Sequence, residues 1–240
     1  MMDIGVVMPV WNAEKHIEDA MDSLRRQTII ERADVAIVLD GPQDVVTKTC
    51  VQNSGYAYAS FKDNLGAHAA INEGHRIILR DSPNIPYLCW ISADNVLEPD
   101  YLEILVNELR GSGADFVYGP YAREQGVVVD GKWAPRSRRV VFPPVYSPDL
   151  LVANVDCYIG AAFAYKREVW QGTPGGHRPG RSHDYDWWLR AEEAGFTGRK
   201  IDSKPLVHYR VHPQSVKYTK KEQYNADKYQ AEALERRSAG

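Results

Sequence analysis

Short apolar runs alternate with amphipathic segments through the first half of the chain. The apolar runs lie at residues 4–10, 35–39 and 87–91, with a weaker one at 56–61, and each ends in polar or turn-forming residues. Continuous apolar runs of this length are typical of strands that are buried on both faces. Strands that alternate with helices form a mainly parallel sheet with right-handed crossovers. We therefore expect an α/β fold with a mostly parallel central sheet flanked by helices.

The segments between these runs have the apolar spacing of helices. Residues 17–24 place their apolar side chains on one helix face, and Asn12 is the expected N-cap of that helix. The same spacing predicts helices at residues 47–53, 69–78 and 101–109.

In the second half of the chain the regular alternation weakens. A strand is expected at residues 114–118 and a hairpin at 127–133, because Asp130-Gly131 is a favoured two-residue turn. Residues 135–148 are basic and rich in proline, which predicts an extended surface segment. Residues 156–166 are apolar with small side chains, and we expect them to return to the core.

Residues 172–180 contain four glycines and two prolines, which predicts a mobile loop of the kind that often closes over active sites. A helix is expected directly after this loop, capped by Ser182 or Asp184 and ended by Gly195. The remaining expected elements are a strand at 201–209, a polar turn with Arg210, His212 and Ser215, and a charged helix at 220–237 whose apolar contacts are Tyr224, Tyr229 and Leu234.

Polar side chains follow three of the predicted strands at their carboxyl ends. Trp11 and Asn12 follow the first strand, Asp40 follows the second, and the turn Ser92-Ala-Asp-Asn95 follows the fourth. Each of these groups alone is also explained as ordinary turn chemistry. Ligands of open α/β sheets bind outside the carboxyl ends of the strands. Three polar groups at one edge therefore favour a binding cleft.

Composition narrows the class of protein. The chain has 240 residues, which suits one large domain or a domain with a small annex, and its net charge of -3 does not indicate a general nucleic-acid-binding surface. Its three cysteines are far apart, which indicates free thiols in a reducing compartment. The sequence contains neither a signal peptide nor a membrane-spanning run, so we expect a cytoplasmic protein.

Several short motifs occur in one order along the chain, and together they carry a resemblance. They are Val7-Met-Pro-Val-Trp-Asn-Ala-Glu14, Val38-Leu-Asp-Gly41, Asn64-Leu-Gly66 with Ala70-Ile-Asn-Glu-Gly74, Ser92-Ala-Asp-Asn95 with Pro99, His183-Asp-Tyr-Asp186 and Tyr209-Arg-Val-His-Pro-Gln-Ser215. Over residues 4–218 the chain resembles the family 2 glycosyltransferases of GT-A fold, which is a Rossmann-like sheet with a C-terminal acceptor-side subregion.

The resemblance implies binding of a nucleotide-sugar donor, most readily a UDP- or dTDP-sugar. Trp11 would stack on the base, and Asp40 would accept a hydrogen bond from the imide N–H of the base. Asn64 and Asn72 would be structural residues and polar lining of the donor pocket, and Arg210 would contact phosphate. The donor-binding residues implied by the resemblance are Pro9, Val10, Trp11, Asn12, Glu14, Asp40, Asn64, Gly66, Asn72, Ser92, Ala93, Asp94, Asn95 and Arg210.

The resemblance also implies a metal and a catalytic base. Asp94 matches the metal carboxylate of the family, and His212 is either a second ligand to Mn²⁺ or Mg²⁺, a phosphate contact, or an ordinary turn histidine. Asp184 matches the general base of an inverting transfer to an acceptor hydroxyl. The family usually has two or three acids where this chain has Ser92-Ala-Asp-Asn95, so Asp94 is expected to carry most of the metal binding.

The resemblance implies one domain with a nucleotide-sugar-binding half at residues 1–112 and an acceptor-binding and catalytic-base half at 113–218, followed by a C-terminal helix at 219–240. The acceptor is left open between a glycan, a lipid-linked oligosaccharide, a protein and a nucleobase. The C-terminal helix is expected to pack as an outer strap or in a homodimer. Two alternatives to an active transferase are a nucleotide-sugar-binding protein that has lost transfer and a nucleotidyltransferase on a similar sheet.

Overall fold

In the described part of the chain, the central sheet has seven strands, in the order β10-β6-β9-β4-β1-β2-β3. The computed structural model describes residues 2–153, 157–180, 182–215 and 226–238. Among the described strands of this sheet, only β9 runs antiparallel to its neighbours, so the expected mostly parallel α/β fold is confirmed. The strands are β1 (Ile4–Val10), β2 (Ala33–Leu39), β3 (Ala57–Ser60), β4 (Tyr87–Trp90), β6 (Phe116–Tyr118), β9 (Phe163–Lys166) and β10 (Gly198–Lys200).

Strand β1 is buried on both faces, because successive side chains of a strand point to opposite sides of the sheet. Val6 and Met8 lie in one apolar core, which contains side chains of α1 (Ile17–Arg25) and α4 (Tyr101–Ser112). Val7 lies in the other core, with side chains of α3 (Ala67–Asp81), α6 (Arg167–Gly172) and α7 (His183–Glu193). Helix α3 approaches β1 closely at Gly74, where a Cβ atom would overlap the side chain of Val7.

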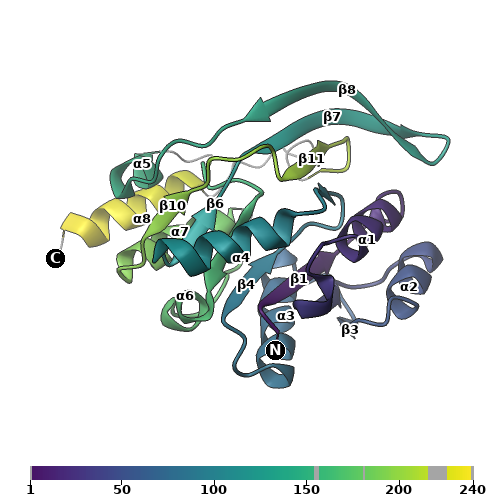
Figure 1. Ribbon diagram of the computed structural model, residues 1–240, viewed down its shortest axis with the longest axis horizontal. Coiled ribbons are helices and arrows are strands. Elements are labelled where there is room, and N and C mark those ends of the chain that lie inside the picture. Colours follow the sequence, from purple (N-terminus) through teal and green to yellow (C-terminus); the bar gives the residue numbers. More distant parts are fainter. Residues whose placement is uncertain (1, 154–156, 181, 216–225, 239–240) are drawn as a thin grey trace.

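A second sheet has the strand order β5-β11-β7-β8, and β8 forms its outer edge (Figure 1). These strands are β5 (Val96–Leu97), β11 (Val207–Val211), β7 (Tyr121–Val129) and β8 (Lys132–Val141). The predicted hairpin turn is confirmed, with positive φ at Asp130 and Gly131. Its strands are longer than expected: β8 accommodates Pro135 at a register shift opposite Gly126, so part of the predicted irregular segment at 135–148 is strand.

Several element boundaries differ from the sequence-based expectations. Asn12 is not the N-cap of α1, which begins at Ile17; Asn12 instead adopts a positive φ of 49° in the preceding turn. Helix α2 (Val45–Gln52) begins earlier than predicted because the Asp44 side chain accepts a hydrogen bond from the Thr47 N–H. Strand β11 begins at Val207, and Arg210 lies within it and not on the turn that follows.

The C-terminal helix packs against the body of the protein. Helix α8 (Ala226–Ser238) buries Ala226, Tyr229 and Ala233 and lies beside α7 and α5 (Pro148–Ala153), as Figure 1 shows. The predicted strap is therefore present. Residues 220–225 of the predicted helix, which include Tyr224, lie outside the described residues. The homodimer stays a prediction. A short 3-10 helix, η1 (Ile30–Arg32), directly precedes β2. Within the described part of the chain, no helix is both long and apolar enough to cross a membrane.

Candidate functional site

The ends of the central strands form the floor of the candidate site. The Asp40 N–H donates to the carbonyl of Val10 at 2.9 Å, and the Ile91 N–H donates to the carbonyl of Val7 at 2.9 Å. These bonds hold the turns after β1, β2 and β4 at one edge of the sheet, where the sequence places its three polar groups. Trp11 is 44% exposed at this edge, as a side chain available for stacking on a ligand would be.

Asp40 organises the loop that leads into α3. Its buried carboxylate accepts hydrogen bonds from the backbone N–H groups of Leu65 at 2.7 Å and Gly66 at 3.0 Å, and the Asn64 amide donates to the Asp40 carbonyl at 3.4 Å. Gly66 has a φ of 94°, which favours glycine at this position. Each carboxylate oxygen has a second lone pair, so a further donor such as a base N–H is compatible with this geometry. The base contact of Asp40 stays a prediction.

Asp94 and His212 converge although 118 residues separate them. The Nε2 atom of His212 lies 3.2 Å from the Oδ2 atom of Asp94. The Nδ1 atom of the same ring lies 3.2 Å from the side-chain oxygen of Gln214, and the His212 N–H donates to the Ser215 hydroxyl at 2.9 Å. When Nδ1 carries the proton and donates to Gln214, Nε2 of the neutral ring presents a lone pair to the carboxylate. Two acceptors then face each other, and a cation between them would stabilise both.

This pair fits a divalent cation that takes most of its ligands from elsewhere. Among the described residues, no group of three or more His, Cys, Asp or Glu side chains is arranged to hold a metal. Mn²⁺ and Mg²⁺ sites in phosphate-binding proteins commonly use one or two protein ligands and are completed by water and phosphate oxygens. Asp94 and His212 would hold such an ion only together with a phosphate-containing ligand.

Two aromatic residues that the sequence did not single out surround His212. The ring of His16, at the start of α1, lies 4.3 Å from that of His212 between centroids, and Trp133 from β8 lies edge-on to both rings. Burial lowers the pKa of His16 to about 4, and the neighbouring His212 adds to this effect. The Trp133 ring is itself held in place, because its Nε1–H donates to Glu124 at 3.0 Å.

A hydrogen bond between Arg210 and Asn95 links the predicted metal turn to β11. The Asn95 side chain is buried and accepts a hydrogen bond from the Arg210 N–H at 3.1 Å. The Arg210 guanidinium donates to Asp19 at 2.7 Å and lies over the Trp133 ring at 5.1 Å. These contacts give both residues a structural role, and their predicted contacts with the donor stay predictions.

Five of the other implied donor-binding residues lie at the same strand ends or directly after them. Pro9 and Val10 belong to β1, and the exposed Glu14 follows in the turn before α1. In the turn after β4, Ala93 is buried and the Ser92 carbonyl accepts a hydrogen bond from the Asn95 N–H at 3.2 Å.

Asp184 lies in the first turn of α7, where the partial positive charge of the helix N-terminus favours a carboxylate. The preceding residue, His183, lies 6.0 Å from the Trp90 ring between centroids. Trp90 ends β4, two residues before Ser92. The predicted base is therefore on a helix that begins close to the strand that carries the predicted metal turn.

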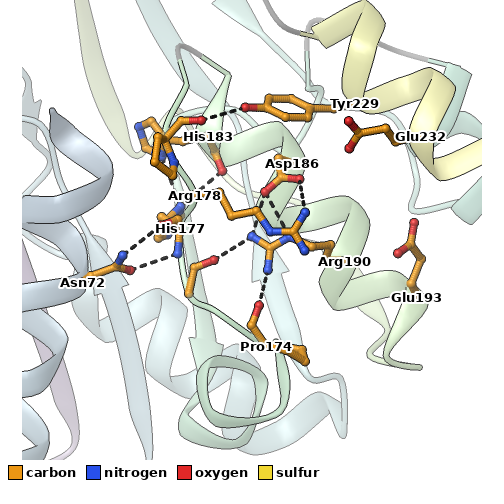
Figure 2. Close-up of polar contacts among 12 residues, drawn as sticks. Asn72, Pro174, His177, Arg178, His183, Asp186, Arg190, Glu193, Tyr229 and Glu232 are labelled. Carbon is orange, nitrogen blue, oxygen red and sulfur yellow. Dashed lines mark hydrogen bonds and ion pairs between the residues drawn. The ribbon is translucent and has the colours of Figure 1, made fainter.

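Residues 173–180 are fastened at several points, although the sequence predicts a mobile loop (Figure 2). Asn72 from α3 exchanges two hydrogen bonds with the backbone of His177, at 2.8 and 2.9 Å. Arg190 from α7 donates to the carbonyls of Pro174 and Gly176, both at 2.6 Å, and the Tyr229 hydroxyl donates to the Pro179 carbonyl at 3.0 Å. These contacts hold the loop in place against the start of α7. Asn72 therefore has a structural role, and its role in lining the donor pocket stays a prediction.

A buried ion pair and a histidine pair complete this support. Asp186 and Arg190 are both buried and lie one helical turn apart, with N–O distances of 2.7 and 3.0 Å. The Nδ1 atom of His177 lies 3.1 Å from Nδ1 of His183 and 3.3 Å from the His183 carbonyl. A carbonyl oxygen can only accept a hydrogen bond, so His177 Nδ1 carries a proton. The unprotonated Nδ1 of His183 then accepts a hydrogen bond from it. Burial lowers the pKa of both rings, which keeps them neutral in this arrangement.

Comparison with known families identifies the family of the chain. The family model described as "Glycosyl transferase family 2" matches residues 5–172. The chain belongs to this family. Glycosyltransferase GlyA of Streptococcus pneumoniae is 29% identical over 121 residues, which is 49% of this chain and 16% of that protein. The chain spans between 16% and 34% of the length of the curated relatives it matches.

Two solved structures share the fold over nearly the whole chain. S. aureus TarS residues 1–349 in complex with UDP-GlcNAc has a TM-score of 0.68 at 13% identity, covering 99% of this chain and 73% of that one. The mannosyltransferase PcManGT of Pyrobaculum calidifontis, in complex with GDP-Man and Mn²⁺, has a TM-score of 0.60 at 16% identity, covering 96% and 61%. The GT-A fold expected from the sequence motifs is confirmed.

Proposed function

We propose that this protein is an inverting glycosyltransferase that transfers a sugar from a nucleotide-sugar donor to an acceptor hydroxyl. The observation that carries the proposal is the 3.2 Å approach of His212 to Asp94 at the carboxyl edge of the sheet. Two converging ligand side chains at this edge match the need of a nucleoside diphosphate for a bound cation. Family membership supports the same reaction class.

The donor would lie across the strand ends, with its base against Trp11. The exposed ring of Trp11 offers a stacking surface, and stacking on a base contributes about 1–3 kcal/mol. Asp40 offers its remaining lone pairs to the imide N–H of uracil or thymine, which supports a UDP- or dTDP-sugar. The UDP-GlcNAc bound to the TarS structure supports UDP, and the GDP-Man bound to PcManGT shows that related folds accept another base.

The diphosphate of the donor would complete the coordination that Asp94 and His212 begin. Bound there, Mn²⁺ or Mg²⁺ supplies positive charge that stabilises the departing nucleoside diphosphate. Asp94 provides a hard oxygen ligand, and the Gln214 contact of His212 orients Nε2 toward it. The Mn²⁺ in the mannosyltransferase structure supports this assignment.

Asp184 would act as the general base. Its carboxylate takes the proton of the acceptor hydroxyl while that oxygen forms a bond to the anomeric carbon of the sugar. The bond between the anomeric carbon and the diphosphate oxygen breaks at the same time, and the nucleoside diphosphate departs without needing a proton. Attack from the face opposite to the leaving group inverts the anomeric configuration. Residues 113–218 would bind the acceptor, which is a glycan, a lipid-linked sugar, a protein or a nucleobase.

The decisive experiment measures release of nucleoside diphosphate from a panel of UDP-, dTDP- and GDP-sugars, with Mn²⁺, with Mg²⁺ and with chelator. We expect hydrolysis of at least one donor, lost with chelator and in Asp94→Ala, and only weakened in Ser92→Ala. Equal behaviour of the two variants, or no effect of chelator, contradicts the metal assignment. Donor binding without any turnover indicates the binding-protein alternative, and release of pyrophosphate from a nucleoside triphosphate indicates a nucleotidyltransferase.

A further inference from the structure

One segment of the surface combines cations with exposed apolar side chains, and the candidate site does not use it. We call it the basic edge and define it as Arg136, Arg139, Val140, Phe142 and Val145, on β8 and the chain that follows. Residues 131–148 contain four Lys or Arg side chains and no Asp or Glu, in a chain whose net charge is -3. The basic edge is thus a local reversal of the charge of the protein.

The apolar members of the basic edge are open to solvent. Phe142 is 65% exposed, Val145 is 73% exposed and Val140 is 38% exposed. Single exposed apolar residues are ordinary, but these three lie within six consecutive positions and directly follow the arginines. Their side chains are available for burial against a partner.

The arginines are also largely uncompensated. Arg138, which lies between the two arginines of the basic edge, forms an ion pair with Glu124 at 3.3 Å. Arg136 and Arg139 form no ion pair with any residue that the structure describes. The positive charges of Arg136 and Arg139 are therefore available to an anionic partner.

Protection of an edge strand explains only part of this pattern. β8 is the outer edge of its sheet, and charged side chains on an edge strand prevent pairing with other chains (Figure 1). Antiparallel pairing of two copies centred between Ser137 and Arg138 would place Arg136 opposite Arg139, and this like-charge contact disfavours a second copy at this edge. Edge protection leaves the exposure of Phe142 and Val145, beyond the end of the strand, unexplained.

We propose that the basic edge docks on an anionic lipid surface. Basic side chains near such a surface each contribute about fivefold in affinity, and neighbouring aromatic and aliphatic side chains enter the boundary between head groups and acyl chains. Arg136 and Arg139 supply the first interaction, and Phe142 and Val145 supply the second. The other end of β8 carries Trp133, which contacts His212, so β8 connects the basic edge to the candidate site. Lipid docking itself does not depend on the proposed transferase activity.

Co-sedimentation of the full chain with vesicles tests the proposal. We expect binding to phosphatidylcholine vesicles that contain 30% phosphatidylglycerol, at least tenfold weaker binding to pure phosphatidylcholine, and loss of binding in 0.5 M salt. Equal binding to both compositions, or binding that salt does not change, overturns the proposal. Release of the protein by millimolar glycerol phosphate also overturns it, because a pocket for a single phosphate group would then be the site.

Two variants separate the contributions of charge and apolar surface. Arg136→Glu combined with Arg139→Glu should weaken binding at least about 20-fold, and Phe142→Ser combined with Val145→Ser at least about tenfold. The matched control is Lys48→Glu combined with Val45→Ser, which changes an exposed cation and an exposed apolar residue on α2, away from the basic edge. Wild-type binding by both test variants contradicts the proposal. The proposal is also contradicted if the protein binds a labelled single-stranded oligonucleotide more tightly than it binds the anionic vesicles, and if Phe142→Ser combined with Val145→Ser does not change that binding. This result would indicate a nucleic-acid surface.

Discussion

The side-chain amide of Asn72 and the backbone of His177 form a two-way hydrogen-bonded link across 105 residues of sequence. The Asn72 Nδ2–H donates to the His177 carbonyl at 2.8 Å, and the His177 N–H donates to Asn72 Oδ1 at 2.9 Å. The neighbouring Gly176 has a φ of 57°, and a Cβ atom there would lie 2.6 Å from Asn72 Oδ1. Helix α3, which lies in the half predicted to bind the donor, thus fixes the loop that precedes Asp184, the predicted base.

Replacing Asn72 by alanine should destabilise the protein. The variant loses the partners of a part-buried N–H and a part-buried carbonyl, and an unsatisfied buried polar group costs about 1–3 kcal/mol. Urea unfolding measures the free energy of unfolding directly. Asn53→Ala, at an exposed position after α2, is the control and should change stability by less than about 0.5 kcal/mol. Similar losses in the two variants would contradict the role of the link.

Stability should fall in acid because of His75. This ring is fully buried between the Ile71 carbonyl and the Tyr165 hydroxyl, both at 2.7 Å, and burial lowers its pKa from 6.5 to about 4. Between these two values the unfolded chain binds more protons than the folded chain, so the free energy of unfolding decreases as pH falls. The contribution is complete above pH 6.5 and is lost toward pH 4 at about 1.4 kcal/mol per pH unit.

Urea unfolding at pH 7 and pH 5 tests this dependence. His75 alone should contribute about 2 kcal/mol to the decrease between pH 6.5 and pH 5, since that interval is about 1.5 pH units. Because burial also lowers the pKa of His16, His177 and His183, the wild-type decrease contains other contributions. The His75→Gln variant removes only the part that belongs to His75. If the free energy of unfolding of this variant falls as much between pH 7 and pH 5 as that of the wild type, His75 does not cause the pH dependence.

The sequence predicts the core of the sheet and its polar edge well. β1, β2 and β4 are continuous apolar runs, and the carboxyl ends of parallel strands must share one edge, so Trp11, Asp40 and Asp94 are brought to that edge by topology alone. The hairpin turn at Asp130-Gly131 was equally predictable, because its conformation is a local property of those two residues.

Features that depend on distant contacts were not predictable in the same way. The glycines of residues 172–180 indicate local freedom, but Asn72 and Arg190 remove that freedom from elsewhere in the chain. His16 and Trp133 meet at His212 only because the second sheet folds over the strand ends, and neither residue has a local signal of that contact. Asn12 has the composition of an N-cap, yet the chain needs its positive φ for the turn after β1.

The Trp133 ring should tune metal binding through His212. Trp133 lies 6.5 Å from His212 and 5.8 Å from His16 between ring centroids, and it also covers Arg210. Loss of a residue that orients a metal ligand typically lowers metal affinity 10–100-fold. We therefore expect Trp133→Ala to weaken Mn²⁺ binding in the presence of UDP by about this factor, measured by calorimetry. Trp133→Phe keeps an aromatic ring and should recover much of the affinity; equal losses would show that the ring does not orient His212.

Asp184→Asn should separate binding from transfer. The substitution keeps the size of the side chain but removes the carboxylate that we propose takes the proton of the acceptor hydroxyl, and general-base catalysis typically contributes about 10²–10⁴-fold. We expect donor affinity measured by calorimetry to stay within about twofold and turnover to fall by that factor. Asp202→Asn, whose side chain is 89% exposed, is the control and should keep wild-type turnover. Near-normal turnover in Asp184→Asn would remove Asp184 from the mechanism, and a parallel loss of donor binding would assign it to the donor site instead.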